Sequence, residues 1–471
     1  MVAEEVKHNC GFCVAHTLHD VYSFIKSLQH RGREAAGIAC IGDKSIDVIK
    51  WAGSVSRFDI NDLYKIFPSE NYHTYLAHVR YATRGRKDKI LQDAHPHVLG
   101  GKIIDKGDHV IIMDCEAVIV HNGQIEEKNI IGVDKAKLKT DCDTEALLHL
   151  YMQKGENGIL RDIPGSYSLA IASRWRKEVI VLRDKTGIKP ASLGWKDGKY
   201  IVASEDIAFK ENGGMFVEDL EPGCVYYLSS EGAYRKDRII DKKVKHCFFE
   251  YNYISDVDSV IDGVSVRRLR EVLGEELAKE FNIKGDVVTF LPRCPELAAR
   301  RYAEKLGIEF VQIFYKPRNE RSFLGSTSDE RRASISNNLH ILPKINGENA
   351  KEYLKNKTII IIDDSTIRGN NSKKAIELLK GFGVNKIYLL NYTPKIGGIG
   401  SDGVGRGCLY GVDMPPDDDF VVRNRTDQEI NEKIGVETHF LSVESMLKGF
   451  ERAGMSKEDL CLFCIGGEKP F

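Results

Sequence analysis

A run of four isoleucines at residues 359–362 passes directly into Asp363 and Asp364, and Gly369 follows shortly before a helical pattern begins. A short, wholly apolar and β-branched run predicts a strand buried on both faces, as in parallel sheets that helices cover. Backbone N–H groups and a helix dipole converge where such a strand passes through a loop into a helix, so this place suits phosphate. The carboxylate pair suits a hard divalent cation.

The two halves of the chain have different patterns of expected strands and helices. After about residue 281, strand and helix patterns alternate, which predicts a doubly wound, mostly parallel sheet. Before about residue 245, short apolar runs end at Gly, Asp or Asn, which predicts a sheet-rich α/β domain. The charged stretch 234–245 is the expected boundary. The expected strands are 75–80, 117–120, 168–172, 179–182, 200–203, 287–291, 308–314, 358–362 and 387–390, and the expected helices are 19–28, 143–154, 296–305 and 372–382.

Composition excludes several classes of protein. The 471 residues suffice for two or three domains, and 68 Lys and Arg against 69 Asp and Glu leave no basic field for nucleic acid. The apolar runs are far too short to span a bilayer, and the first residues lack the apolar core of a signal peptide. We therefore expect a cytoplasmic protein without a membrane or nucleic-acid partner. Its 11 cysteines indicate thiol chemistry or metal sites.

The first half carries several short motifs in a fixed order after Cys10. Taken singly, each is weak, since His-Asn-Gly is usually a turn and Asp-Thr-Glu usually a helix start. Together they resemble the N-terminal-nucleophile glutaminase domain of the class II glutamine amidotransferases, which has a four-layer αββα fold. The resemblance implies a propeptide at 1–9 and a glutaminase domain at 10–245. The motifs are residues 28–37, 77–83, 121–123, 143–145, 165–168, 183–184 and 203–205.

The resemblance also implies roles for five residues of the first half. Once residues 1–9 are removed, Cys10 becomes the nucleophile and its own α-amine the general base, because that amine has a pKa near 8. Asn122 and the N–H of Gly123 form the oxyanion hole. Arg80 holds the α-carboxylate of glutamine through a bidentate pair, and Asp143 binds its α-amine.

The segment 359–372 resembles the phosphoribosyl pyrophosphate (PRPP) motif of type I phosphoribosyltransferases. In that motif Asp363 and Asp364 bind the ribose hydroxyls and Mg²⁺, and the loop 366–371 cradles the 5-phosphate. The resemblance implies a phosphoribosyltransferase domain at 246–471. The PRPP-binding residues it implies are Asp363, Asp364, Ser365, Thr366, Arg368, Gly369, Asn370, Asn371, Lys316, Arg318 and Arg321.

With a glutaminase ahead of this motif, the chain from Cys10 onward resembles the amidophosphoribosyltransferase family. That family makes 5-phosphoribosylamine from glutamine and PRPP at the first committed step of purine synthesis. The resemblance implies that ammonia crosses inside the protein to carbon 1 of PRPP. It also implies purine nucleotides as inhibitors and a homo-oligomer.

Four cysteines lie where one branch of this family holds a 4Fe-4S cluster: Cys247, Cys408, Cys461 and Cys464. Four thiolates suit such a cluster, which would fasten the C-terminal tail to the domain junction. Zinc is the alternative for any set of four cysteines with a Cys-x-x-Cys pair. Five others have no such partners and are interpreted as isolated buried or surface thiols: Cys13, Cys40, Cys115, Cys142 and Cys224.

The departures from the family pattern concentrate at the PRPP site. At the pyrophosphate loop, Pro295 lacks an N–H, and Cys294 replaces a hydroxyl beside Mg²⁺, for which a thiol is a poor ligand. Asn370 and Asn371 replace two threonines, and the loop beginning at Lys316 is one residue shorter. Two hypotheses follow: a divergent amidophosphoribosyltransferase, or a glutaminase-competent relative with impaired PRPP transfer. The second would supply ammonia to another acceptor or use its second domain for regulation.

Overall fold

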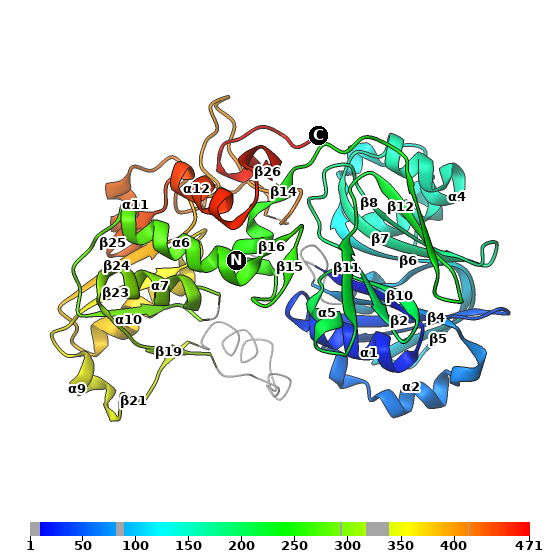
Figure 1. The fold of residues 1–471 in the computed structure, drawn as a ribbon, viewed down its shortest axis with the longest axis horizontal. Coiled ribbons are helices and arrows are strands. Elements are labelled where there is room, and N and C mark those ends of the chain that lie inside the picture. Colours follow the sequence, from blue (N-terminus) through cyan, green and yellow to red (C-terminus); the bar gives the residue numbers. More distant parts are fainter. Residues whose placement is uncertain (1–9, 82–88, 293, 317–338, 413) are drawn as a thin grey trace.

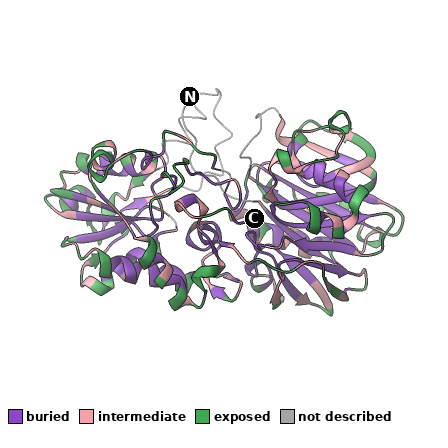
Figure 2. Ribbon diagram, turned by 90° about the horizontal axis from the view of Figure 1, so that it is seen from above, coloured by how far each residue is buried: buried purple, intermediate pink, exposed green. Residues whose placement is uncertain are grey.

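The computed structural model describes residues 10–81, 89–292, 294–316, 339–412 and 414–471. The propeptide expected at 1–9 and two expected PRPP ligands, Arg318 and Arg321, lie outside these residues. Two α/β bodies lie side by side, the first built from the blue to green part of the chain and the second from the green to red part (Figure 1). In both, the strands are largely buried, while the helices expose one side (Figure 2).

The first body is a four-layer αββα sandwich. Its thirteen strands are linked through the long β6 (His109–Gln124), which pairs with β3 (Ile46–Ala52) near its start and with β7 (Ser166–Ser173) near its end. One layer follows the order β11 (Met215–Asp219), β9 (Ser192–Lys196), β10 (Lys199–Ala203), β1 (Gly11–Ala15), β4 (Thr74–Arg80), β2 (Ala35–Ile41) and β3. The other contains β5 (His97–Asp105), β6, β7, β8 (Val179–Arg183), β12 (Cys224–Leu228) and β13 (Tyr234–Arg238).

Side-chain alternation along the strands explains the four layers. In β1, Phe12 and Val14 face the second sheet, whereas Cys13 and Ala15 pack against helix α1 (Leu18–Ser27). Helices α2 (Ile60–Ile66) and α5 (Ile207–Lys210) cover the same outer face. Helix α4 (Asp143–Asp162) covers the outer face of the other sheet.

The second body contains a parallel five-stranded sheet with helices on both faces, as expected. The isoleucine run forms its central strand, with Ile360 and Ile362 facing one helical layer and Ile359 and Ile361 the other. The strand order is β18 (Glu309–Phe310), β17 (Val287–Phe290), β23 (Thr358–Asp363), β24 (Lys386–Asn391) and β25 (Glu437–Phe440). The helices are α6 (Val266–Glu280), α7 (Glu296–Leu306) and α12 (Val443–Ala453) on one face, and α9 (Ala350–Leu354), α10 (Asn370–Gly381) and α11 (Asp427–Ile434) on the other.

One prediction from the pattern was wrong in part. The single strand expected at 308–314 is two short strands, because only β18 joins the main sheet, while β19 (Phe314–Tyr315) pairs with β20 (His340–Ile341). The first residues of the charged stretch 234–245 form β13 at the edge of the first body, where charged side chains reach solvent. Within the described parts of the chain, none of the helices has the length and apolar composition that crossing a bilayer requires.

Candidate functional site

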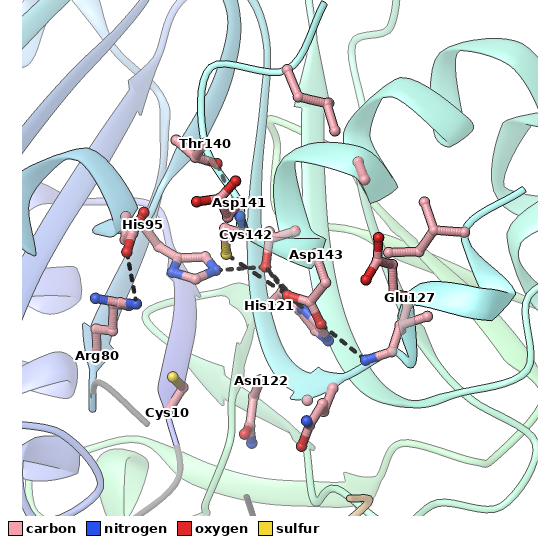
Figure 3. A pocket seen from close by; sticks show the side chains of 18 of the residues that line it. Cys10, Arg80, His95, His121, Asn122, Glu127, Thr140, Asp141, Cys142 and Asp143 are labelled. Atoms are coloured by element: carbon pink, nitrogen blue, oxygen red, sulfur yellow. Dashed lines mark hydrogen bonds and ion pairs between the residues drawn. The ribbon is translucent and has the colours of Figure 1, made fainter. Parts of the chain in front are cut away.

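The first body contains a cavity of about 810 Å³ that gathers all five residues expected to act on glutamine (Figure 3). Cys10 immediately precedes β1, and Arg80 is the last residue of β4. Asn122 and Gly123 lie near the end of β6, and Asp143 is the first residue of α4. Residues far apart in sequence therefore meet at one edge of the sandwich.

The buried side chain of Arg31 holds the backbone of Cys10. The Nε of Arg31 donates a hydrogen bond to the carbonyl oxygen of Cys10 at 2.9 Å. Burial raises the pKa of the Cys10 thiol, while a hydrogen bond to the backbone of Tyr81 and the charge of Arg80 act in the opposite direction. The thiol therefore needs a base to become a nucleophile at neutral pH.

Asn122 is completely buried, and neither atom of its side-chain amide has a hydrogen-bond partner among the described residues. A buried amide without partners is costly unless a ligand completes it. Its neighbour Gly123 admits no side chain, since a Cβ there would collide with the carbonyl oxygen of Ser166. An unused N–H donor near the Cys10 thiol is the feature that an oxyanion hole requires.

Arg80 and Asp143 give this cavity one cationic and one anionic wall. Asp143 is oriented through its Oδ2, which accepts a hydrogen bond from the N–H of Ile125 at 2.9 Å. Arg80 lies 3.5 Å from the Oδ2 of Asp93, measured from Nη2. Opposite charges on two walls suit a zwitterion such as a free amino acid, with its carboxylate toward Arg80 and its ammonium toward Asp143.

A buried ionic network joins this cavity to the second body. Arg31 pairs with Glu205 of the first body and, at 3.0 Å, with Glu250 of the second. Glu205 also accepts a hydrogen bond from the Ser259 hydroxyl at 2.6 Å. Burial by itself raises the pKa of Glu205, but the charges of His30 and Arg31 outweigh it and hold that pKa below its ordinary value.

A second cavity, of about 550 Å³, lies at the carboxyl end of β23. Arg33 and Tyr81 of the first body also line it, and Tyr81 lines the first cavity as well. Tyr81 lies within the motif 77–83, but no role of its own followed from the sequence, because its place between the cavities depends on how the two bodies meet. The expected PRPP residues that line this cavity are Lys316, Asp363, Asp364, Ser365, Thr366, Arg368, Gly369, Asn370 and Asn371.

The two acids at the end of β23 are buried next to each other, which disfavours two negative charges at this place. Burial and the charge of Asp364 raise the pKa of Asp363 well above its ordinary value. Burial raises the pKa of Asp364 to about 6, although the Ser365 hydroxyl and the charge of Arg270 oppose the shift. A cation at this pair would remove the cost of holding two carboxylates together.

The phosphate loop is shaped by a glycine and ends at a helix. Gly369 has φ +76°, and a Cβ there would lie 2.5 Å from Cδ1 of Ile434, so any other residue would strain the backbone and displace the Ile434 side chain. The 12-residue helix α10 begins at Asn370 and directs its first N–H groups toward this end of the sheet.

Three polar side chains around this loop make contacts within the protein. The Thr366 hydroxyl donates to Oδ1 of Asn391 at 2.7 Å, and Nη2 of Arg368 pairs with Asp417 at 2.6 Å. The Cys294 thiol donates to the Tyr253 carbonyl oxygen at 3.3 Å, so it is engaged away from the acid pair. The acids, the backbone of the loop and basic side chains such as Lys316 are the features that the cavity presents to a ligand.

The four cysteines expected to hold a cluster are all buried where the C-terminal tail meets the start of the second body. Cys247 and Cys461 are directly opposite in the parallel pair β14 (His246–Cys247) and β26 (Leu460–Cys461). Burial and the charges of the neighbouring cysteines raise the pKa of Cys247 and Cys464 well above its ordinary value. The N–H of Val412 donates to Sγ of Cys408 at 3.3 Å.

Comparisons with known proteins cover both bodies. Residues 66–248 match a family model described as a glutamine amidotransferase domain. The amidophosphoribosyltransferase of Methanocaldococcus jannaschii is 29% identical over 96% of this chain and 94% of its own length. The enzyme of the same name from Bacillus subtilis is 29% identical over 95% of this chain and 90% of its own.

Solved structures agree over nearly the whole chain. Glutamine PRPP amidotransferase from Bacillus subtilis, complexed with ADP and GMP, superposes with a TM-score of 0.78 at 27% identity, covering 98% of this chain and 97% of that one. This likeness confirms the expected pairing of an N-terminal-nucleophile sandwich with a doubly wound sheet.

Proposed function

The chain belongs to the amidophosphoribosyltransferase family, and we propose that it transfers the amide nitrogen of glutamine to PRPP, forming 5-phosphoribosylamine. The observation that carries this proposal is the pair of cavities. One offers a thiol, an unpartnered amide and walls of opposite charge, and the other offers an acid pair above a phosphate loop. Tyr81 belongs to both linings, so ammonia released in one has a short path to the other.

We infer that the glutaminase step begins with removal of residues 1–9. The α-amine of Cys10 then takes the thiol proton, and the thiolate attacks the carbonyl carbon of the glutamine side-chain amide. The resulting α-ammonium group gives the proton to the amide nitrogen, the C–N bond breaks to release ammonia, and the thioester left on Cys10 is hydrolysed by water to glutamate. Asn122 and the Gly123 N–H stabilise the tetrahedral oxyanion, a donor type worth about 10²–10³ in rate. Arg80 and Asp143 hold the substrate through its carboxylate and ammonium groups.

In the second step, ammonia attacks carbon 1 of PRPP and pyrophosphate leaves. The loop 366–371 and the start of α10 hold the 5-phosphate through backbone N–H groups, and Asp363 and Asp364 hold the ribose hydroxyls. The same acids would hold Mg²⁺, which neutralises charge on the departing pyrophosphate when it is bound. The reaction needs no protein nucleophile, because positioning and charge neutralisation suffice. Lys316 lines the cavity and adds a positive charge.

We propose that Cys247, Cys408, Cys461 and Cys464 hold a 4Fe-4S cluster. Their donor set fits, since all four are buried and a Cβ at Gly411 would collide with Sγ of Cys247. A single zinc ion would bring its sulfur ligands to about 3.8 Å from one another. Among the described residues, no three of these four sulfur atoms lie within 4.8 Å of one another, which favours the larger 4Fe-4S cluster over a single zinc ion. Its role would be to fasten the tail to the second body.

Further proposals follow from the family. The glutaminase domain spans residues 10–245, and the phosphoribosyltransferase domain spans 246–471. Purine nucleotides inhibit by occupying phosphate sites, and the Bacillus subtilis relative was solved with ADP and GMP. The protein assembles as a homo-oligomer.

The alternative, a glutaminase that passes ammonia to another acceptor, has one observation in its favour. Cys294 is directed toward Tyr253 and offers no hydroxyl to a metal at the acid pair. The deciding experiment measures glutamate and pyrophosphate release in the same tubes, with and without PRPP and Mg²⁺, on protein with a sequenced amino terminus. Matched pyrophosphate and PRPP-stimulated glutamate support the transferase. Glutamate without pyrophosphate would overturn it in favour of the alternative.

A further inference from the structure

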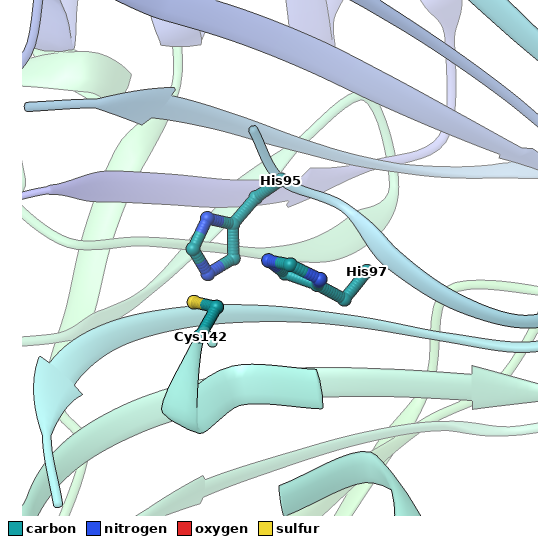
Figure 4. Close-up of side chains that lie close together, drawn as sticks. All are labelled: His95, His97 and Cys142. Carbon is teal, nitrogen blue, oxygen red and sulfur yellow. The ribbon is translucent and has the colours of Figure 1, made fainter. Parts of the chain in front are cut away.

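Two histidines and a cysteine meet at the wall of the first cavity, in positions that the proposed chemistry does not use (Figure 4). His95 precedes β5, His97 is the first residue of β5, and Cys142 is the N-cap residue of α4. One ligand atom from each lies within 4.8 Å of the other two. Among the described residues, no other set of three His, Cys, Asp or Glu is as close.

The imidazoles are not satisfied core histidines. Nδ1 of His95 and Nε2 of His97 are buried and have no hydrogen-bond partner in the described structure. Buried ring nitrogens without a partner are costly unless a ligand completes them.

The surroundings hold these rings in place. His95 stacks on His78 with ring centroids 4.0 Å apart, and its Nε2 lies 2.9 Å from the Thr144 hydroxyl oxygen. The ring of His97 hydrogen-bonds to the backbone of Asp93, the kind of outer contact that orients metal-binding histidines. Burial and the charge of Asp143 raise the pKa of the Cys142 thiol to about 12, so without a metal this sulfur stays a thiol, and Lys50, anchored by the Ala94 carbonyl oxygen at 2.9 Å, is the nearby positive charge.

We propose that His95, His97 and Cys142 form a zinc site in the wall of the glutamine cavity. Two imidazole nitrogens and a thiolate are the donors that Zn²⁺ prefers, and tetrahedral coordination needs ligand atoms about 3.3–3.8 Å apart, which small side-chain rotations reach. As the metal–sulfur bond forms, the thiol proton leaves to solvent, and the neutral imidazoles release none. Cys142, interpreted from the sequence as an isolated thiol, thereby gains a function.

The open coordination position would face the glutamine site. His95 and Cys142 both line the cavity, and Sγ of Cys142 lies 3.7 Å from Oδ1 of Asp143. Three protein ligands leave the fourth position of a tetrahedral ion to water or a bound molecule. The metal site itself does not depend on the proposed glutaminase activity, since its ligands are distinct from the residues assigned to glutamine.

The test must separate this site from the four cysteines at the tail, which also bind zinc when they lack iron. Full-length protein with its iron loaded is incubated with Zn²⁺, freed of loose metal by gel filtration, and analysed for zinc and iron per chain. The variants are Cys142→Ser and His97→Gln, with Cys224→Ser as a control, because Cys224 is another buried cysteine, on β12. We expect the wild type and the control to retain a zinc ion that both variants lose, at equal iron content.

Zinc-edge X-ray absorption on the wild-type sample keeps the test decisive if either variant fails to fold. A mixed shell of nitrogen and sulfur neighbours is expected for this site. A shell of sulfur alone would place the metal at the tail cysteines and overturn the proposal. Equal zinc content in the wild type and both folded variants, or no retained zinc at all, would overturn it too.

Discussion

Single atoms without partners are the most informative features of the first cavity. The Asn122 amide is buried with no hydrogen bond among the described residues, a state it shares with Asn252, although most buried amides in proteins are paired. An amide with a structural role would be hydrogen-bonded within the protein. An amide that stabilises an oxyanion must instead be able to donate its hydrogen bond when the oxyanion forms. The same reasoning separates Arg31, which is fully engaged with Glu205, Glu250 and the Cys10 backbone, from groups that act on a ligand.

Replacing Asn122 with alanine tests whether this single hydrogen-bond donor stabilises the oxyanion. In Asn122→Ala we expect kcat for glutamine hydrolysis to fall about 10²–10³-fold with a small change in KM, because the amide contacts the oxyanion only as it forms. Steady-state glutamate release measures both constants. The exposed Asn61 on α2 supplies a matched control as Asn61→Ala. A rise in KM at unchanged kcat would assign Asn122 to ground-state binding instead.

At the scale of elements, the strand β23, its loop and helix α10 form one phosphate-binding unit. Gly369 joins the loop to the helix in a left-handed conformation against Ile434. In Gly369→Ala we expect KM for PRPP to rise at least tenfold, because backbone strain of about 1–3 kcal/mol moves the first N–H groups of α10. Glutaminase activity without PRPP should persist.

The same helix supplies the control for that substitution. Gly381 is the last residue of α10, and a Cβ added there would meet no neighbouring atom within 4 Å and no left-handed φ. Gly381→Ala should leave KM for PRPP unchanged and, if anything, stabilise the helix by about 0.5–1 kcal/mol. If both alanines raised KM equally, the loop conformation would not be the cause.

Elements were more predictable from the sequence than the contacts between them. The apolar run 359–362, which two acids follow, predicts its strand, because a strand that is buried on both faces is apolar at every position. Cys10, Arg80, Asn122 and Asp143 could be assigned through motif order, and the structure places them in one cavity. The position of Tyr81 between the two cavities and the grouping of His95, His97 and Cys142 could not be predicted, because both arise from packing that no local pattern records.

For the whole molecule, the buried network around Glu205 is one of the ionic contacts between the bodies, together with the pair of Arg183 and Asp262. In Glu205→Gln, Arg31 loses a buried partner, so we expect the free energy of unfolding to fall by about 3–5 kcal/mol at pH 7. The pKa of Glu205 lies below 4.5 in the folded protein, so its contribution is present above pH 4.5 and is lost as pH falls through that lowered value. Denaturant unfolding from pH 7 to pH 3 should show the two proteins converging at the acid end. A constant difference would mean that the carboxylate charge is not what stabilises the junction.

A short series of contacts connects Cys247, one of the four buried cysteines, with the glutamine cavity. Cys247 abuts Gly411, whose carbonyl oxygen accepts a hydrogen bond from Lys189, and both Lys189 and Tyr410 line that cavity. Tyr410 packs on Phe463 and Phe471 of the tail, with ring centroids 5.2 and 5.0 Å apart. A metal centre that holds these segments therefore also fixes a wall of the glutaminase site.

Loss of the cluster should consequently weaken glutamine binding at a distance from the nucleophile. In Cys461→Ser we expect iron content to fall, the C-terminal tail to become susceptible to protease, and KM for glutamine to rise several-fold while Cys10 still reacts with a thiol-directed reagent. Cys224→Ser, a buried cysteine outside the tail group, should change none of these. If iron is lost but the tail stays protected and KM is unchanged, the cysteines hold metal without supporting the cavity, and Tyr410 is positioned by aromatic packing alone.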